Sequence, residues 1–285
     1  MKINRTASFI IIALVYAISS VVGVIIFNAL KFDLWLNLLI ADVVATAVVF
    51  AFSLIFKNAS VYDPYWSVQP MVIALFIALN AGANALSIIM MAVVFTWGVR
   101  LTANWAYTFY GMAHQDWRYT MLKETTGVFY PLINFFGIHL FPTLVVYLCV
   151  LPVVYGIILN APINAFSVLF CALSLVATAL QGTADCQMHK FKKLKKQGVA
   201  NGFIRIGLWK YSRHPNYLGE ILMWWGMALS LVCALPSTWY LCAGAVVNTL
   251  MFLIVSIPMA DRRQSKKEGF AEYKMATRIL LPIKK

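Results

Sequence analysis

Charged residues are scarce in this sequence, and acidic residues are the scarcest of them. Of 285 residues, 12% are charged and only 10 are Asp or Glu, whereas 62% are hydrophobic. A soluble globular domain has about 25% charged and about 45–50% apolar residues. The composition therefore excludes a disordered chain, a collagen-like chain and an ordinary soluble enzyme, and it indicates an integral membrane protein whose partner is the lipid bilayer.

Two common signatures of ligand sites are also missing. The five cysteines form no CxxC pair, and the one CxxH, Cys186 to His189, has no second pair to complete a four-ligand zinc site. No metal site is expected. The chain also has no GxGxxG string, so any dinucleotide must be held without a Rossmann fold.

Long apolar segments dominate what is present. A helix needs about 20 predominantly apolar residues to cross a bilayer. The candidate segments are 7–28, 34–56, 68–83, 86–108, 130–158, 163–187, 217–235 and 237–259. Because 68–83 and 217–235 are short and one of them could be re-entrant, we predict an all-α transmembrane bundle of seven to eight spans. The bundle forms one membrane-embedded domain, 1–285.

The basic residues predict how the chain is oriented. Of 23 Lys and Arg, eight lie in 190–213 and eight in 262–285, beside membrane spans rather than over a soluble surface. This pattern favours a cytoplasmic location for both clusters by the positive-inside rule, and it does not indicate a nucleic-acid binder. The polar stretches 57–67, 109–129 and 188–216 then all face the cytoplasm. The same charge could also bind an anionic ligand.

Three candidate helices carry polar groups at helical spacing, and such groups in a span usually face a cavity or a partner. The spacing gives each helix one polar face. The faces consist of Trp97, Arg100, Asn104 and Thr108; of Gln181, Asp185 and His189, continued by Lys192 and Lys193; and of Asn216, Glu220 and Trp224. A simpler interpretation is hydrogen bonding between helices. Since an Arg, an Asp and a Glu open toward the same basic loops, a shared polar cavity is favoured.

An acid among aromatic residues marks the start of the third span. Asp63 lies within Tyr62-Asp63-Pro64-Tyr65-Trp66. A buried carboxyl there can donate a proton or a hydrogen bond to a carbonyl oxygen. The alternative is a helix cap followed by a turn at Pro64.

The most specific string is GLWKYSRHPNYLGE at 207–220. Arg213 and His214 supply cationic or donor groups just before a predicted helix, and Pro215 suits its first turn. Asn216 and Glu220, one turn apart, can hydrogen-bond amide or ribose groups. The exposed backbone donors of a helix start also favour an anion.

These motifs resemble the steroid 5α-reductase family in its bacterial branch. The resemblance covers 57–285 and leaves 1–56 as variable amino-terminal spans. It depends on SVYDPYW at 60–66, WGVRLTANW at 97–105, DWRY at 116–119, GLWKYSRHPNYLGE at 207–220 and EGFAEYKMATRILLPI at 268–283.

The resemblance implies an oxidoreductase of the bacterial inner membrane, with a cytoplasm-facing NADPH site, that reduces the C4–C5 double bond of 3-oxo-Δ4 steroids or a similar lipid enone. A family Gln-Glu pair corresponds to Tyr62-Asp63, and a proton-donor tyrosine to Trp97, so the catalytic candidates are Asp63, Tyr62 and Trp97. Tyr65 and Trp66 are the substrate-binding candidates. The cofactor-binding candidates are Arg100, Asn104, Arg118, Tyr119, Asp185, Arg205, Tyr211, Arg213, His214, Asn216, Tyr217, Glu220, Arg262 and Arg263.

The chemistry of enone reduction agrees with an acid at this site, because hydride delivery to an enone places negative charge on its carbonyl oxygen. A donor aimed at that oxygen is worth roughly 3 kcal/mol. Two alternatives stay open. The Arg-His-Pro-x-Tyr-x-Gly string also resembles isoprenylcysteine and phospholipid methyltransferases that use S-adenosylmethionine, but only over the last third of the chain. A transporter would use the polar faces as a pathway, although no internal inverted repeat is visible.

Overall fold

The computed structural model describes residues 4–282. Ile283, which ends the tail motif, and Lys284 and Lys285 of the second basic cluster lie outside them. The described chain is helical, with one isolated β-bridge between Ser212 and Arg278 and no strand. The helices are α1 (Arg5–Ala29), α2 (Leu34–Ile55), α3 (Tyr65–Ala81), α4 (Ala85–Thr108), α5 (Trp117–Thr126), α6 (Tyr130–Ile133), α7 (Phe141–Ile158), α8 (Ala165–Lys196), α9 (Pro215–Ala234), α10 (Ala243–Met251), α11 (Ile257–Gln264) and α12 (Phe270–Ala276).

Eight helical segments in the described part are long and apolar enough to cross a membrane. Short π-helical turns join α6 to α7 and α10 to α11, so each pair makes one long segment. The predicted all-α bundle is confirmed, and the chain is an integral membrane protein. Each span expected from the sequence corresponds to one of the eight segments.

Two boundaries differ from the expected ones, and both have local causes. Helix α8 continues to Lys196 rather than ending near residue 187, with Lys193, Lys195 and Lys196 in its last turn. Cations there interact favourably with the negative end of the helix dipole. The expected polar loop 109–129 contains helix α5, which Asp116 caps by accepting a hydrogen bond from the Arg118 N–H.

The chain divides into two compact units, described here one at a time. The first contains the residues up to Phe76 together with Gly98–Val150, and the second contains Ile77–Trp97 and the chain from Leu151 onward. Helices α3, α4 and α7 therefore each contribute to both.

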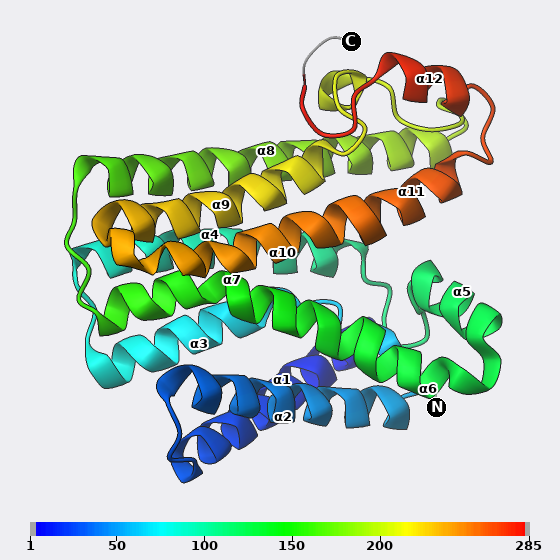
Figure 1. Cartoon of the computed structure of the whole chain (residues 1–285). Helices are drawn as coiled ribbons and strands as arrows, with labels where there is room; N and C mark the ends of the chain where they lie inside the picture. The colour runs from blue at the N-terminus through cyan, green and yellow to red at the C-terminus, as the bar shows by residue number, and fades with distance from the viewer. Residues whose placement is uncertain (1–3, 283–285) are drawn as a thin grey trace. The chain divides into compact units, whose positions relative to one another are not determined.

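In the first unit, α1 and α2 form a helical hairpin (Figure 1). The Asn4 side chain caps α1 by accepting a hydrogen bond from the Ala7 N–H. Next to this hairpin, the chain from Asn58 to Val61 contacts the segment that leads into α5. The amide of Asn58 donates to the carbonyls of Met112 and His114, and the Asp116 N–H donates to Ser60 Oγ at 3.0 Å.

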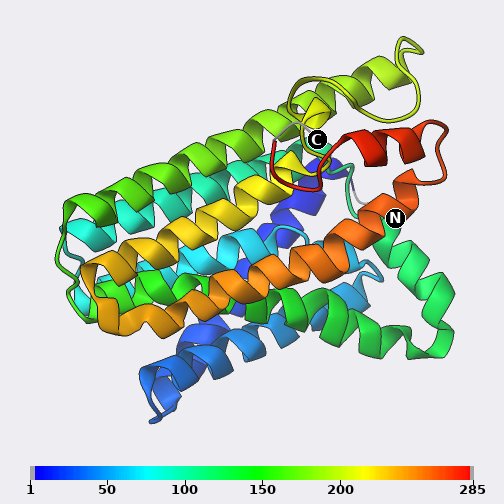
Figure 2. The ribbon, with the colours of Figure 1, turned by 45° about the horizontal axis from the view of Figure 1, so that its top comes forward.

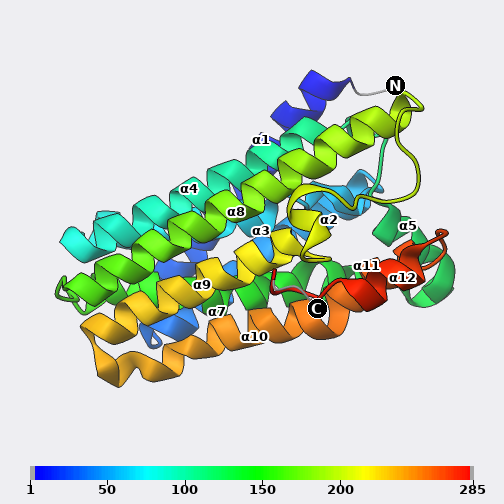
Figure 3. The same ribbon diagram turned by 90° about the horizontal axis from the view of Figure 1, so that it is seen from above.

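In the second unit, α8 and α9 lie side by side over their length and run antiparallel (Figure 3). The segment α10–α11 runs next to α9 (Figure 2). Two glycines allow the close approach of α9 to α8. A Cβ atom on Gly219 would lie 2.6 Å from the Ala177 carbonyl oxygen, and one on Gly226 would lie 2.0 Å from Ser174 Oγ. Small residues at helix contacts are typical of packing in membranes.

Candidate functional site

The carboxylate of Glu220 is the centre of a buried polar cluster in the second unit. Glu220 is 1% exposed and lies on α9. It accepts hydrogen bonds from Trp97 Nε1 at 2.8 Å, Gln181 Nε2 at 2.6 Å and Trp224 Nε1 at 2.9 Å. Hydrogen bonds to a charged acceptor are the strong ones. The faces predicted on α4, α8 and α9 therefore meet at this carboxylate, through Trp97, Gln181 and Glu220.

One turn toward the start of α9, a second polar pair joins the same two helices. The amide of Asn216 donates to Asp185 Oδ1 at 3.4 Å, and both residues are partly buried. Within the described residues, Asn216 Oδ1 and Gln181 Oε1 are buried and accept no hydrogen bond. Buried polar atoms are normally satisfied. These two oxygens can therefore accept hydrogen bonds from a ligand's amide or hydroxyl group.

Arg213 and His214 contact the carboxy-terminal tail. The Arg213 guanidinium donates to Asp261 Oδ2 at 3.2 Å and to the Thr277 carbonyl at 2.7 Å, and His214 Nε2 lies 3.0 Å from Asp261 Oδ1. The N–H groups of both residues donate to tail carbonyls, at Arg278 and Ile279. Both side chains are buried. The two residues predicted to bind a cofactor thus hold the tail in place, and no motif pointed to their partner Asp261.

The tail also packs on the loop that precedes α9. Tyr273 donates a hydrogen bond to the Trp209 carbonyl, and Trp209 Nε1 donates to the Ala184 carbonyl on α8 at 3.1 Å. Burial raises the pKa of Tyr273 to about 12, so its hydroxyl stays protonated at neutral pH. The tail, the loop and the end of α8 therefore form one packed group of segments.

Cations surround this group of segments. Arg205, Arg262 and Arg263 are exposed, as are the lysines at the end of α8. The Arg205 guanidinium lies over the Phe203 ring, 4.3 Å from its centroid. Tyr211 is exposed, whereas the Tyr217 ring stacks on His214 at 5.2 Å. Exposed guanidinium and ammonium groups of this kind can bind phosphate.

The first unit contains the predicted acid and gives it an unexpected partner. The hydroxyl of Tyr119, at the start of α5, donates to Asp63 Oδ1 at 2.5 Å. Tyr62, the neighbour expected to assist Asp63, instead hydrogen-bonds Thr143 Oγ1 at 2.9 Å. The motifs SVYDPYW and DWRY therefore meet through Asp63 and Tyr119. Asp63 and Pro64 form the turn that directly precedes α3.

The other candidates of the first unit have separate environments. Tyr65 is buried, with its ring 5.3 Å from that of Tyr16. Trp66 is half-buried. Arg118 is about half exposed and pairs with Asp116 at 2.8 Å. Arg100 and Asn104 lie partly buried on the first-unit part of α4.

Two polar groups that sequence reasoning missed are also buried in the first unit. His139, on the π-helical turn before α7, is fully buried with its Nδ1 2.9 Å from the Asn134 carbonyl oxygen. Asp42 and Gln69 form a buried hydrogen-bonded pair at 2.6 Å. His139, Asp42 and Gln69 are each a single polar residue within an apolar stretch of sequence. Sequence alone cannot distinguish such a residue from one that only joins two helices.

No group of three or more His, Cys, Asp or Glu that could hold a metal ion occurs between residues 4 and 282.

The fold defines a helical integral membrane protein, and comparison with known families identifies the family. A family model described as "Protein of unknown function (DUF1295)" matches residues 49–277. The match covers more than half of the chain, so the chain belongs to the DUF1295 family.

One curated relative comes from the fission yeast Schizosaccharomyces pombe and carries the name "Uncharacterized protein C594.04c". It is 27% identical over 192 residues, which are 59% of this chain and 56% of that protein. The chain thus spans about half the length of the curated relative that it matches. No solved structure matches the chain.

Proposed function

We propose that this protein is an NADPH-dependent reductase of the bacterial inner membrane that saturates the C4–C5 double bond of a 3-oxo-Δ4 steroid or a similar lipid enone. The motif resemblance to steroid 5α-reductases supports the reaction class. The contact between α8 and α9 supports the cofactor, and the Asp63–Tyr119 pair supports the acid.

The residues of the second unit suit a phosphorylated dinucleotide. The unsatisfied amide oxygens of Gln181 and Asn216 can accept hydrogen bonds from amide or ribose donors. Exposed Arg205, Arg262 and Arg263 can bind phosphate oxygens. Bound NADPH supplies the hydride, and the protein needs only to orient it and exclude water.

Glu220 would act as a positioning residue for this site. Its carboxylate fixes Gln181 on α8 and Trp97 on α4, so the amide oxygen of Gln181 is held in one orientation. A site whose groups are already oriented loses little free energy to reorganisation when the ligand binds. Arg213 and His214 act indirectly, by holding the tail that carries Lys274 and Arg278.

Asp63 is assigned the role of proton or hydrogen-bond donor to the ketone oxygen. As negative charge develops on that oxygen, a donor stabilises the enolate. Tyr119 donates to one carboxyl oxygen and leaves the other able to carry a proton. The proposal requires that the substrate ketone reach this carboxyl during turnover.

The single observation that carries the proposal is the Asp185–Asn216 pair. It joins α8 and α9, contains the buried oxygen Asn216 Oδ1 and lies one turn from the buried oxygen Gln181 Oε1. Neither oxygen accepts a hydrogen bond from residues 4–282, and the exposed cations of the tail and of the end of α8 belong to the same unit. A site with both charged and amide-recognising groups suits a nucleotide better than a purely anionic headgroup.

The test is a titration of the purified full-length protein with NADPH, followed by cofactor fluorescence. Asn216→Ala and Asp185→Ala are each expected to weaken binding about tenfold, which corresponds to one hydrogen bond of about 1.4 kcal/mol. Asn201→Ala, an exposed residue of the adjoining loop, is the control and should bind as the wild type does. Unchanged titrations for both variants would contradict the cofactor assignment.

An S-adenosylmethionine-dependent methyltransferase is the second candidate. The observation that favours it concerns the Arg-His-Pro-x-Tyr-x-Gly string followed by Glu220, on which that resemblance depends. This string lies in the second unit, as do Asp261, which pairs with Arg213, and Trp224, which donates to Glu220. The same titration with S-adenosylmethionine separates the two. Binding of S-adenosylmethionine without binding of NADPH would favour the methyltransferase and would leave Asp63 without an assigned role.

A further inference from the structure

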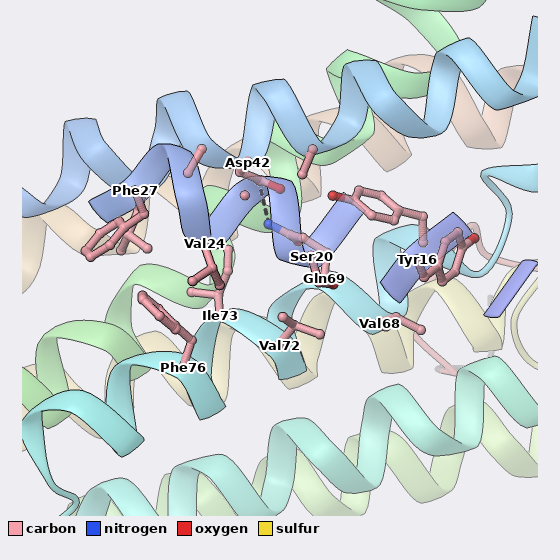
Figure 4. Close-up of a pocket in the computed structure, with 15 residues that line it drawn as sticks. Tyr16, Ser20, Val24, Phe27, Asp42, Val68, Gln69, Val72, Ile73 and Phe76 are labelled. Atoms are coloured by element: carbon pink, nitrogen blue, oxygen red, sulfur yellow. Dashed lines mark hydrogen bonds between the residues drawn. The ribbon is translucent and has the colours of Figure 1, made fainter. Parts of the chain in front are cut away.

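A pocket in the first unit shares one residue, Tyr65, with the candidates named for the reductase. Fifteen residues of α1, α2 and α3 line it, and neither Asp63 nor any cofactor-binding candidate is among them (Figure 4). The pocket extends about 16 Å along the axis of α1. This length is the rise of the eleven residues that separate Tyr16 from Phe27, both of which line the pocket.

The walls of the pocket are almost entirely apolar. Val24 and Phe27 on α1 face Val72, Ile73 and Phe76 on α3 (Figure 4). The rings of Phe27 and Phe76 meet edge to face, with centroids 5.1 Å apart, and bound one part of the pocket. An apolar pocket with a few placed polar groups is the usual form of a small-molecule site.

Asp42 and Gln69 form a hydrogen-bonded polar pair in this pocket, whose lining also includes the hydroxyl groups of Tyr16, Ser20 and Tyr65. Gln69 Nε2 donates to Asp42 Oδ2 at 2.6 Å, and Tyr65 also hydrogen-bonds the Asp42 carboxyl. Gln69 is 4% exposed. Its other amide atom, Oε1, is buried and has no hydrogen-bond partner among residues 4–282. An unsatisfied buried acceptor costs about 1–3 kcal/mol, which a bound donor would offset.

We infer that this pocket binds an apolar molecule with one hydroxyl group, such as a long-chain alcohol. The hydroxyl donates to Gln69 Oε1, and the hydrocarbon lies along Val24 and Val72 toward Phe27 and Phe76. A narrow pocket between three helices suits a chain, and only a donor satisfies the free amide oxygen. A carboxylate is unsuitable because it would place a second negative charge next to Asp42.

The test is photolabelling of the full-length protein in phosphatidylcholine nanodiscs, with dodecan-1-ol that carries a diazirine on its chain. Labelled residues are mapped by mass spectrometry. Labelling is expected on the residues that line the pocket, and unlabelled dodecan-1-ol should compete at a concentration at least tenfold lower than dodecane. Tenfold corresponds to one hydrogen bond of about 1.4 kcal/mol. Competition by cholesterol at the same low concentration would support the hydroxyl site and identify a sterol as its source. Failure of cholesterol to compete would support a straight-chain alcohol.

Gly23→Leu should fill the pocket and lower this labelling about tenfold. A Cβ atom on Gly23 meets only ordinary contacts, 3.5 Å from Ala45 Cβ and 3.6 Å from the Ala41 carbonyl oxygen. Ala17→Leu, on the exposed side of α1 outside the pocket, is the matched control and should label as the wild type does.

A double variant, Asp42→Met with Gln69→Met, removes both polar partners and keeps the apolar walls. Replacing both partners together avoids an unpaired buried group. In this variant the alcohol and the alkane should compete equally, which also tests the proposal if Gly23→Leu does not fold. The proposal is overturned by equal competition of alcohol and alkane in the wild type, or by labelling that a folded Gly23→Leu variant leaves unchanged. None of these results depends on reductase activity.

Discussion

At the scale of single residues, the Glu220 carboxylate is expected to stabilise the second unit strongly. Its carboxylate accepts three N–H donors. Glu220→Ala leaves these donors buried and unsatisfied, and we expect the free energy of unfolding to fall by about 3 kcal/mol. Glu220→Gln should cost about half of that, because one amide oxygen can still accept from Trp97 and Gln181.

The measurement is thermal unfolding in detergent, followed by a dye that reacts with the buried thiols of Cys149 and Cys171 as they become exposed. Trp225→Phe is the control on the same helix, because it removes one hydrogen bond, to Thr249 at 3.0 Å, and should cost about 1 kcal/mol. A Glu220→Ala variant that unfolds at the wild-type temperature would rule out this role for the carboxylate.

The Asp63–Tyr119 pair leads to a prediction about rate. If Asp63 is the acid, Asp63→Asn should lower the rate of enone reduction about a hundredfold or more and leave NADPH affinity unchanged. Tyr119→Phe should have a smaller effect, because the carboxyl remains but loses the hydrogen bond that orients it. Asp116→Asn, which changes the nearby cap of α5, is the control for local structure. Normal turnover in Asp63→Asn would remove Asp63 from the mechanism.

The residue scale also indicates what sequence could predict. Helical spacing was sufficient to place Trp97, Gln181 and Glu220 on faces that meet, because a period of 3.6 residues fixes the direction of each side chain. Spacing could not find Asp261 as the partner of Arg213, since the two are 48 residues apart. For the same reason, the sequence predicts Tyr62 as the tyrosine that assists Asp63, whereas the tyrosine that donates a hydrogen bond to Asp63 is Tyr119, 56 residues away.

At the scale of helices, the glycines of α9 determine how close α8 can lie. Gly226→Ala would place a methyl group 2.0 Å from Ser174 Oγ and 2.9 Å from the Phe170 carbonyl oxygen. The helices must then separate, at a cost of about 1–3 kcal/mol. We expect a lower unfolding temperature and weaker NADPH binding, because Asn216 moves away from Asp185. Gly137→Ala, whose Cβ would meet only Ile133 Cγ2 at 3.8 Å, is the control and should behave as the wild type does.

The tail is the second element with a measurable role. Asp261→Ala leaves the buried Arg213 guanidinium without its carboxylate, and breaking such a pair costs about 3–5 kcal/mol. The tail should detach from the loop before α9, and trypsin should then cleave after Lys274 and Arg278 much faster than in the wild type. Glu272→Ala, an exposed acid of α12, is the control. Equal cleavage rates in Asp261→Ala and wild type would mean that the β-bridge and backbone contacts hold the tail without Asp261.

At the scale of the whole molecule, the number and positions of the spans could be predicted because bilayer thickness sets the length of an apolar helix. The carboxy-terminal end of α8 and the existence of helix α5 could not be predicted, because helix caps and charges determine them rather than hydropathy. The pocket that contains Asp42 and Gln69 could not be predicted either. Its polar pair joins α2 and α3, and the sequence of each helix is that of an ordinary apolar span.

The whole chain finally predicts an orientation. If each of the eight segments crosses the membrane, both ends of the described chain lie on one side, together with the connections after α2, α4 and α8. The opposite connections, after α1, α3, α7 and α9, contain Lys31 as their one Lys or Arg. The positive-inside rule then predicts that the side rich in cations is the cytoplasmic one. Alkaline phosphatase fused after Lys285 should therefore be inactive in a bacterial cell, and the same enzyme fused after Asn160, between α7 and α8, should be active. The reverse pattern would place the Asp185–Asn216 pair at the outer surface, where no NADPH is available, and would contradict the proposed function together with the orientation.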